Sequence, residues 1–252
     1  MPRVAAGLAL LAFVGLWQTL ALALGDQVLP TPAAVAADFW LRLGQPEFHR
    51  HLLASLWRGS AGFFLGLVTA IPLGWLMGRL KTLDAFLAPL LFLTYPVPKV
   101  LFLPVLLVTL GLGEAPKIIL VAVTVGYQAL VVTRDSALNL DPAHLEAFDS
   151  LCPPRKPPLA KALALTRHVL WPASLPAVLT AARLASGTAV SVLFMAESFA
   201  TDLGLGYFIM DAWGNLDLPK MFSGILAMGL LGGMFYVMSV VAEKTWCPWV
   251  KA

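Results

Sequence analysis

Three charged residues stand in or at the end of long apolar stretches, where a charge costs more free energy than in water. Lys99 interrupts one stretch that otherwise carries no charge. Arg183 interrupts a later stretch, and Glu197 closes that same stretch. If these stretches cross a bilayer, a charge costs about 2.5–3.5 kcal/mol on insertion scales and is a functional candidate by default. We therefore expect each of them to meet an opposite charge, a solute or the membrane surface.

Lys99 directly follows two prolines, in the string YPVPK. Pro96 and Pro98 lack backbone donors, so the sequence predicts an unwound helix at this point. A broken helix is tolerated in a membrane only where it faces protein or a water-filled cavity. Pro96, Pro98 and Lys99 are therefore candidates for lining a pathway for an anionic solute. The alternative is a lysine that extends its ammonium to the nearby inner surface.

Arg183 and Glu197 lie in one later stretch and also have two interpretations each. Arg183 can contact a solute, or it can pair with loop carboxylates or lipid phosphates near the inner surface. Glu197 closes the stretch in the string MAESF. It is a candidate for the outer half of a pathway, as part of a gate or of helix packing, and the alternative is an interfacial carboxylate.

The other residues that could support catalysis do not form a recognisable enzyme motif. The chain has no H-E-x-x-H string for a metalloprotease and no G-x-x-x-x-G-K-[ST] string that could hold ATP phosphates. Four histidines are scattered over loops without metal-ligand spacing, and Cys152 and Cys247 lie far apart. We expect no bound metal, no cofactor and no catalytic residue in this chain.

The composition is that of an integral membrane protein. Of 252 residues, 59% are hydrophobic and 12% are charged, about half the charged share of a soluble domain. The mean hydropathy is +0.82. These values exclude a soluble enzyme, a disordered chain and a disulfide scaffold, and the net charge of +3 indicates no nucleic-acid partner.

Runs that are largely free of charge predict six transmembrane helices and an all-α membrane fold. A span needs about 20 apolar residues, and the fourth run reaches this length only with a turn from each flank. The third run contains Lys99 and the fifth contains Arg183. The predicted spans are residues 4–24, 59–78, 85–113, 118–133, 172–196 and 221–242.

The distribution of basic residues predicts that both termini are cytoplasmic. With the N-terminus inside, the inner segments hold 11 Lys and Arg residues and the outer segments hold 5. Cytoplasmic loops carry the excess of basic residues, so this orientation is favoured. A competing interpretation treats the first run as a signal peptide cleaved after the A-x-A string at residues 21–23, although the run is longer than a typical signal core.

The sequence divides into three segments by this interpretation. Residues 1–58 hold the first helix and a periplasmic amphipathic segment, which begins at a predicted cap formed by Thr31 and Pro32. This segment either lies along the outer membrane interface or packs on its own protein. Residues 59–242 form a core of helices two to six, and residues 243–252 form a cytoplasmic tail. Small-xxx-small spacing predicts close helix packing in the second span, at Gly62, Gly66, Gly74 and Gly78.

The longest hydrophilic stretch, residues 134–171, is an inner loop between the fourth and fifth spans. Asp141 and Pro142 form a predicted helix start, and the prolines after Cys152 must end that helix. Residues 159–169 can form a second short helix. Two short helices on the cytoplasmic face would make a docking surface for a soluble partner.

This loop resembles the EAA loop of binding-protein-dependent ABC importer permeases. Glu146 and Ala147 match the opening of the motif, and Pro172, Leu175 and Pro176 match its closing. The strings LPTPAAV, HLLASLWRGSAGFFLG, PVPKVLFLPVLLVTLGLGEAPKI and AESFATDLGLGYFI agree with the family in the same order. They are most similar to the branch that imports nitrate, aliphatic sulfonates, taurine and thiamine precursors.

The loop departs from the family's motif in two ways that bear on its docking geometry. Cys152 stands where the family's motif has glycine, and the distance to Pro172 is about seven residues longer than the family's usual spacing, as judged from the motif. The excess is the proline-rich string PPRKPP. Proline can form an elbow without glycine, so a coupling helix is still expected.

The resemblance implies a transport subunit in the bacterial inner membrane with no catalysis of its own. ATP and magnesium would bind to two separate ATPase subunits that dock on the Glu146 loop. A second permease copy, most simply an identical one, and a periplasmic solute-binding protein would complete the importer. The competing classes are a secondary transporter, which usually shows two matching broken spans, and a membrane-embedded enzyme.

Overall fold

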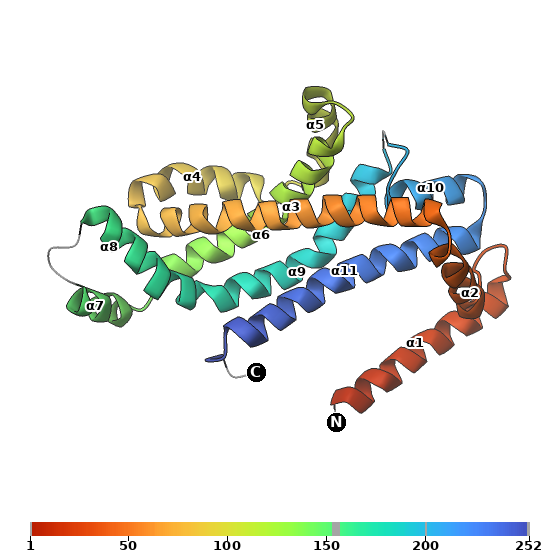
Figure 1. Ribbon diagram of the computed structural model, residues 1–252, viewed down its shortest axis with the longest axis horizontal. Coiled ribbons are helices and arrows are strands. Elements are labelled where there is room, and N and C mark those ends of the chain that lie inside the picture. Colours follow the sequence, from red (N-terminus) through yellow and green to blue (C-terminus); the bar gives the residue numbers. More distant parts are fainter. Residues whose placement is uncertain (1, 153–156, 200, 251–252) are drawn as a thin grey trace. The chain divides into compact units, whose positions relative to one another are not determined.

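A computed structural model describes residues 2–152, 157–199 and 201–250. All regular elements within these residues are helices, which confirms the all-α prediction (Figure 1). In order they are α1 (Pro2–Leu24), α2 (Pro32–Leu43), α3 (Pro46–Arg79), α4 (Lys81–Thr94), η1 (Lys99–Phe102), α5 (Leu103–Leu110), α6 (Glu114–Leu138), α7 (Pro142–Leu151), α8 (Pro158–Leu165), η2 (Thr166–Leu170), α9 (Trp171–Glu197), α10 (Leu205–Gly214) and α11 (Leu218–Trp246).

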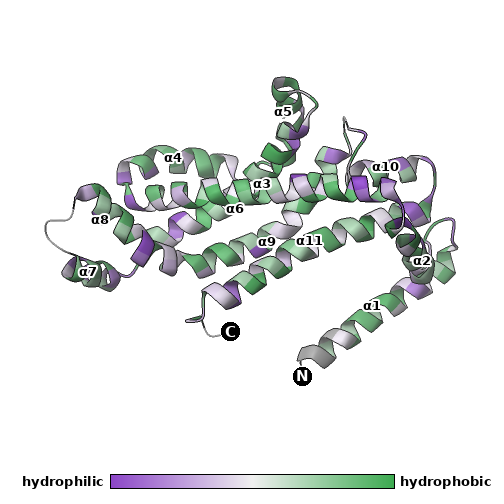
Figure 2. Ribbon diagram, in the orientation of Figure 1, coloured by the Kyte–Doolittle hydropathy of each residue, from purple (hydrophilic) through white to green (hydrophobic). Residues whose placement is uncertain are grey.

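Among the described residues, five helices are long and apolar enough to cross a membrane, or six if one bent pair is a single span. The pair is α4 with η1–α5, bent by 97° where the sequence predicts an unwound helix at Pro96 and Pro98. Helix α6 has 25 residues, so the short fourth run does extend into its flanks. Figure 2 shows α1 and α11 hydrophobic along most of their length.

The chain divides into two compact units. The first contains residues 1–57 and 194–231, and the second contains residues 58–193 and 232–252. Compactness thus groups Phe194–Leu231 with the N-terminal part of the chain. The division into residues 1–58, 59–242 and 243–252 concerns membrane topology and stays a prediction.

In the first unit, α2 starts as the sequence predicts and packs on its own protein. The Thr31 hydroxyl accepts a hydrogen bond from the Ala34 amide at 3.3 Å, and Pro32 occupies the first turn. Val35 is 2% exposed, and the Ser223 hydroxyl donates to the Asp38 carboxylate at 2.8 Å. Trp40 on the opposite face is 73% exposed, so the helix is amphipathic as expected.

In the second unit, α6 has a fully buried face, and α3 packs against it through glycines. Leu120, Val121 and Val125 of α6 are each 0% exposed. A Cβ atom at Gly66 would lie 2.5 Å from the Ala122 carbonyl oxygen, and one at Gly62 would lie 2.6 Å from the Val121 Cβ. The predicted small-residue packing is confirmed, and its partner is a helix of the same chain. Gly74 and Gly78 face α6 in the same way.

One element differs from the sequence prediction. Residues 159–169 do not form a separate short helix, because α8 continues through the single π turn η2 into α9. Together they form a continuous helical segment, Pro158–Glu197, of 40 residues. The sequence between Leu165 and Trp171 has no glycine or proline to stop the helix. Pro172 lacks a backbone donor and comes just after the π turn, where the hydrogen-bond register changes. A π turn accommodates the change of register.

The close approach of α3 and α6 predicts opposite effects of one substitution at two glycines. Alanine gains about 1 kcal/mol over glycine in a helix interior. At Gly66 the new Cβ overlaps a backbone carbonyl that cannot rotate away, and overpacking typically costs about 1–3 kcal/mol. Gly229→Ala on α11 meets no atom within 4 Å and is the matched control.

We expect Gly66→Ala to lower the melting temperature of the detergent-solubilised protein and Gly229→Ala to maintain or raise it. A Gly66→Ala variant as stable as Gly229→Ala would contradict the glycine-mediated packing.

Candidate functional site

Helix α7 is the short exposed helix that the sequence predicts within the inner loop. The Asp141 carboxylate caps its first turn by accepting a hydrogen bond from the Ala143 amide at 2.9 Å, and Pro142 occupies the first helical position. Glu146 and Ala147 are exposed on this helix. Among the described residues, none of α7 is buried, so its side chains are available to a partner.

Cys152 ends α7 where the resemblance leads us to expect glycine. Its backbone is extended (φ −83°, ψ 125°), a conformation open to any residue, and its amide donates to the Phe148 carbonyl at 2.9 Å. This turn needs no positive φ, which explains why glycine is dispensable. Residues 153–156 of the proline-rich insertion lie outside the described residues. Pro157 and Pro158 start α8 directly after them.

A groove of about 730 Å³ beside α7 brings three of the predicted coupling residues together. Ala147, Cys152 and Pro172 all line it, whereas Glu146 and Pro176 do not. An exposed ion pair, Lys161 Nζ to Asp149 Oδ1 at 2.7 Å, also connects α8 with α7. The groove is lined by His144, Ala147, Phe148, Leu151, Cys152, Ala164, His168, Val169, Pro172, Ala173 and Trp249.

Lys99 lies at the break between α4 and η1, and its ammonium is bound by the carbonyls that the break exposes. Lys99 Nζ donates to the carbonyls of Thr94 at 2.7 Å, Val97 at 2.9 Å and Tyr95 at 3.2 Å. It also lies 4.0 Å from the centroid of the Tyr127 ring. Lys99 is 9% exposed. Its ammonium caps the broken helix, because it binds carbonyls that the break leaves without backbone donors. A pathway role for Lys99, Pro96 and Pro98 stays a prediction.

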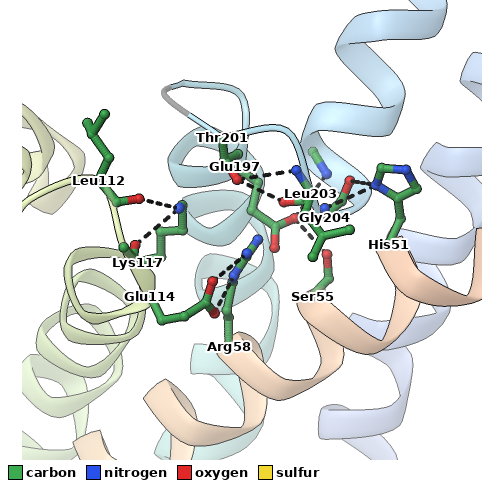
Figure 3. A network of polar contacts seen from close by, with 12 residues as sticks. His51, Ser55, Arg58, Leu112, Glu114, Lys117, Glu197, Thr201, Leu203 and Gly204 are labelled. Atoms are coloured by element: carbon green, nitrogen blue, oxygen red, sulfur yellow. Dashed lines mark hydrogen bonds and ion pairs between the residues drawn. The ribbon is translucent and has the colours of Figure 1, made fainter.

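Glu197 ends α9 in the first unit, where buried donors surround its carboxylate (Figure 3). The Ser55 hydroxyl of α3 donates to Glu197 Oε2 at 2.6 Å, and the Gly206 amide donates to the same oxygen at 3.0 Å. Ser55 in turn accepts a hydrogen bond from the Leu205 amide at 2.7 Å. Glu197 and Ser55 are both 0% exposed. The carboxylate thus holds the start of α10 against α3.

Two glycines make room for Glu197. Gly204 has φ +123°, which side chains with a Cβ rarely adopt, and a Cβ there would overlap the Glu197 carboxyl group. A Cβ at Gly206 would lie 2.6 Å from the Glu197 Cβ. His51 completes the cluster, because the Gly204 amide and His51 Nδ1 are 3.1 Å apart. The string GLG after Asp202 is therefore explained by close approach to a carboxylate.

Three polar residues of α3 have partners that the sequence does not predict. His51, Ser55 and Arg58 lie on one face of α3 at i, i+4 and i+7, but the sequence analysis places them in an outer segment. In the second unit Arg58 is 2% exposed and makes a bidentate ion pair with Glu114, at 2.6 and 2.7 Å (Figure 3). The helical spacing of three polar residues just before an apolar run was the available signal.

Arg183 meets a carboxylate of its own chain. Its guanidinium pairs with Glu243 of α11 in the second unit, and both side chains are about one-quarter exposed. This arrangement fits the structural interpretation of Arg183, although the partner lies on a helix rather than in the inner loop. Lys117 donates to the Leu112 and Gly113 carbonyls at 3.2 and 3.1 Å, and so closes the turn before α6.

A comparison with known families matches residues 70–244, from within α3 to the last turn of α11. The matching family is described as the binding-protein-dependent transport system inner membrane component. The chain belongs to this family. The permease is therefore a multi-pass inner-membrane protein of an ABC importer, and it is a transport component rather than an enzyme.

Three relatives illustrate the range of similarity. A probable ABC transporter permease protein of Brucella melitensis is 30% identical over 246 residues, which cover 96% of this chain and 97% of the relative. A putative aliphatic sulfonates transport permease protein of Escherichia coli is 28% identical, over 99% and 93% of the two chains. A taurine transport system permease protein of Escherichia coli is 26% identical, over 88% and 80%.

The carbonyl contacts of Lys99 predict a stability role. Lys99→Met preserves the length of the side chain but leaves the carbonyls at the break without this donor, which typically costs about 1–3 kcal/mol. We expect the melting temperature of the purified variant to fall by several degrees and Lys99→Arg to restore part of the loss. Lys81→Met, at an exposed lysine, is the control with little expected change. An unchanged melting temperature for Lys99→Met would remove the capping role and favour the pathway interpretation.

Proposed function

We propose that the permease forms the translocation pathway of an ATP-driven importer and works by alternating access. The single observation that carries the coupling part of this proposal is the exposure of Glu146 and Ala147 on a short capped helix. The chain itself has no phosphate-binding loop, so hydrolysis must come from a separate subunit. Two ATPase subunits would bind ATP and magnesium and contact α7.

The helical path from α7 supports a lever mechanism. The Asp149–Lys161 ion pair joins α7 to α8, and α8 continues through η2 into α9 without a break. A displacement of α7 by a closing ATPase would thus be passed along one helix as far as Glu197. Single π turns are frequent at functional sites, and η2 is the point in this helix where the hydrogen-bond register changes.

The remaining partners follow the family. The family description names a binding protein, and we propose that a periplasmic solute-binding protein delivers the solute. A second permease copy would face the first across the pathway. We propose a homodimer as the simplest assembly, because symmetric pairs of identical chains are the commonest oligomers.

The proposed solute is a small anion of the sulfonate or taurine type. This proposal rests on the named activities of the two Escherichia coli relatives, and a thiamine-precursor-like compound is the alternative. Lys99 does not supply the reason for an anion, because its ammonium already contacts three backbone carbonyls. Uptake of a radiolabelled alkanesulfonate and of radiolabelled taurine tests the solute class directly, in proteoliposomes that hold the permease and its ATPase together with the binding protein.

The α7 surface predicts that a bulky side chain at Ala147 uncouples the importer. Ala147 lines the groove beside α7, so a tryptophan there would fill the space next to Pro172 and alter the docking shape. We expect the double variant Glu146→Ala with Ala147→Trp to insert normally but to lose both ATPase co-purification and uptake.

Thr82→Trp provides a control for the double variant at another exposed position of an expected inner turn. If the double variant keeps ATPase binding and uptake, α7 is not the coupling element.

The orientation predicts the labelling of the two cysteines. With both termini cytoplasmic, an impermeant maleimide should modify neither Cys152 nor Cys247 in intact cells. After permeabilisation Cys152 should react first, because Cys247 is 2% exposed and burial raises the pKa of its thiol. A higher pKa leaves less thiolate at neutral pH, so labelling of Cys247 should accelerate as the pH rises. Rapid labelling of either cysteine in intact cells would reverse the proposed topology.

A further inference from the structure

The exposed faces of two helices are apolar, as contact with lipid requires. On α11 the exposed residues between Ile225 and Val241 are all apolar or glycine except for Tyr236. On α4 every exposed residue from Ala85 to Leu93 is apolar. A bilayer interior offers no hydrogen-bond partners, so these faces need no other neighbour than lipid tails.

The exposed face of α9 in the second unit is different. Thr180, Leu184, Gly187, Thr188 and Ser191 are exposed, and their spacing of four, three, one and three residues puts them on one side of the helix. Three of these five residues carry a hydroxyl group. The stripe lies well inside a candidate membrane span, Pro158–Glu197.

Hydroxyl groups alone would not require water. Thr188 donates to the Ala185 carbonyl at 3.0 Å and Ser191 donates to the Gly187 carbonyl at 2.9 Å, so each donor is satisfied within its own helix. Thr69 on α3 is exposed and satisfied in the same way. Such residues are tolerated in lipid.

A primary amide lies beside the stripe, and its hydrogen-bonding groups are harder to satisfy in lipid than a hydroxyl is. Gln128 lies near the middle of α6, and its Nε2 donates to the Thr188 hydroxyl at 3.1 Å. This hydrogen bond is exposed on the surface of the second unit. A side-chain amide has two N–H donors and an oxygen with two lone pairs, and this contact uses one donor. Placing the second N–H and the carbonyl oxygen of this amide in hydrocarbon costs free energy, whereas water in a cavity would form hydrogen bonds with both groups.

We propose that Gln128, Thr180, Thr188 and Ser191 form this subunit's wall of the translocation pathway and contact the solute. This inference rests on the proposed function and adds the chemistry of the passage. The second N–H of the Gln128 amide and the Thr180 hydroxyl would donate neutral hydrogen bonds to the oxygens of a small sulfonate. The Thr188 and Ser191 hydroxyls would do so only in exchange for the carbonyls of their own helix. A wall without charge holds an anion weakly, which suits a site that the solute must also leave. Gly187, without a side chain, leaves room beside Thr188.

Cysteine accessibility tests the proposal without a transport measurement. Ser191→Cys and Thr180→Cys are made in a Cys152→Ser, Cys247→Ala background, with Leu230→Cys on the apolar face of α11 as the matched control. The probe is a methanethiosulfonate with a sulfonatoethyl group, which carries the proposed solute chemistry and reacts with thiolate in water. We expect the two α9 positions to react at least about 10-fold faster than Leu230→Cys, since a thiol in lipid does not ionise.

Two results of this experiment would contradict the inference. Ser191→Cys and Thr180→Cys that react as slowly as Leu230→Cys would place the stripe against lipid or protein. Slow labelling together with efficient oxidative cross-linking between two copies would make the stripe a dry subunit interface. Neither result would touch the proposed ATP-driven import, which fails separately if the wild-type importer shows no ATP-dependent uptake.

A second variant tests the proposal without the cysteine-free background, in case that background folds poorly. Gln128→Leu in the otherwise native chain preserves the size of the side chain and removes the amide. We expect normal insertion and ATPase co-purification, and a fall in taurine uptake of about 10-fold if one good hydrogen bond to the solute is lost. Gln128→Asn should retain more uptake than Gln128→Leu. Uptake by Gln128→Leu equal to that of wild type would contradict the proposal.

Discussion

A bilayer interior supplies no water to a polar group, so each donor and acceptor there must find a partner in the protein or face a water-filled space. This constraint accounts for the main local features of the permease. The helix break after α4 persists because the Lys99 ammonium binds three of the carbonyls around it. The Glu197 carboxylate is held by the Ser55 hydroxyl and the Gly206 amide. Where a polar face is left exposed, as on α9, the same constraint points to water.

Close backbone approach is the second organising feature, and it depends on glycine. On α3 the small residues let α6 approach until a Cβ at Gly66 would touch a carbonyl oxygen. In the GLG turn, glycine lets the backbone wrap around Glu197, and Gly204 adopts a φ that other residues avoid. Cys152 shows the converse. Its turn uses extended backbone, so the loss of the motif's glycine has no conformational cost there.

The sequence predicts the helices well because hydropathy, proline and capping residues act locally. Thr31, Asp141 and the two prolines before Lys99 each set a boundary that the structure has. The partners of the charged residues depend on contacts between distant helices, which no local pattern encodes. Arg58 was assigned to an outer segment, yet it is buried against Glu114, 56 residues away in the chain. The run from α8 into α9 was missed because a π turn leaves no clear sequence signal.

We propose that Gln128 and the exposed hydroxyls of α9 line the pathway, and that α7 is where the energy of ATP enters this chain. Site-specific photo-crosslinking in membranes that hold the whole importer tests this entry point most directly. A photoreactive amino acid at Ala147 should form a covalent adduct with the ATPase subunit, and one at Leu230 should not. An ATPase adduct at Thr82 combined with none at Ala147 would contradict the account, because the coupling contact would then lie at the start of α4.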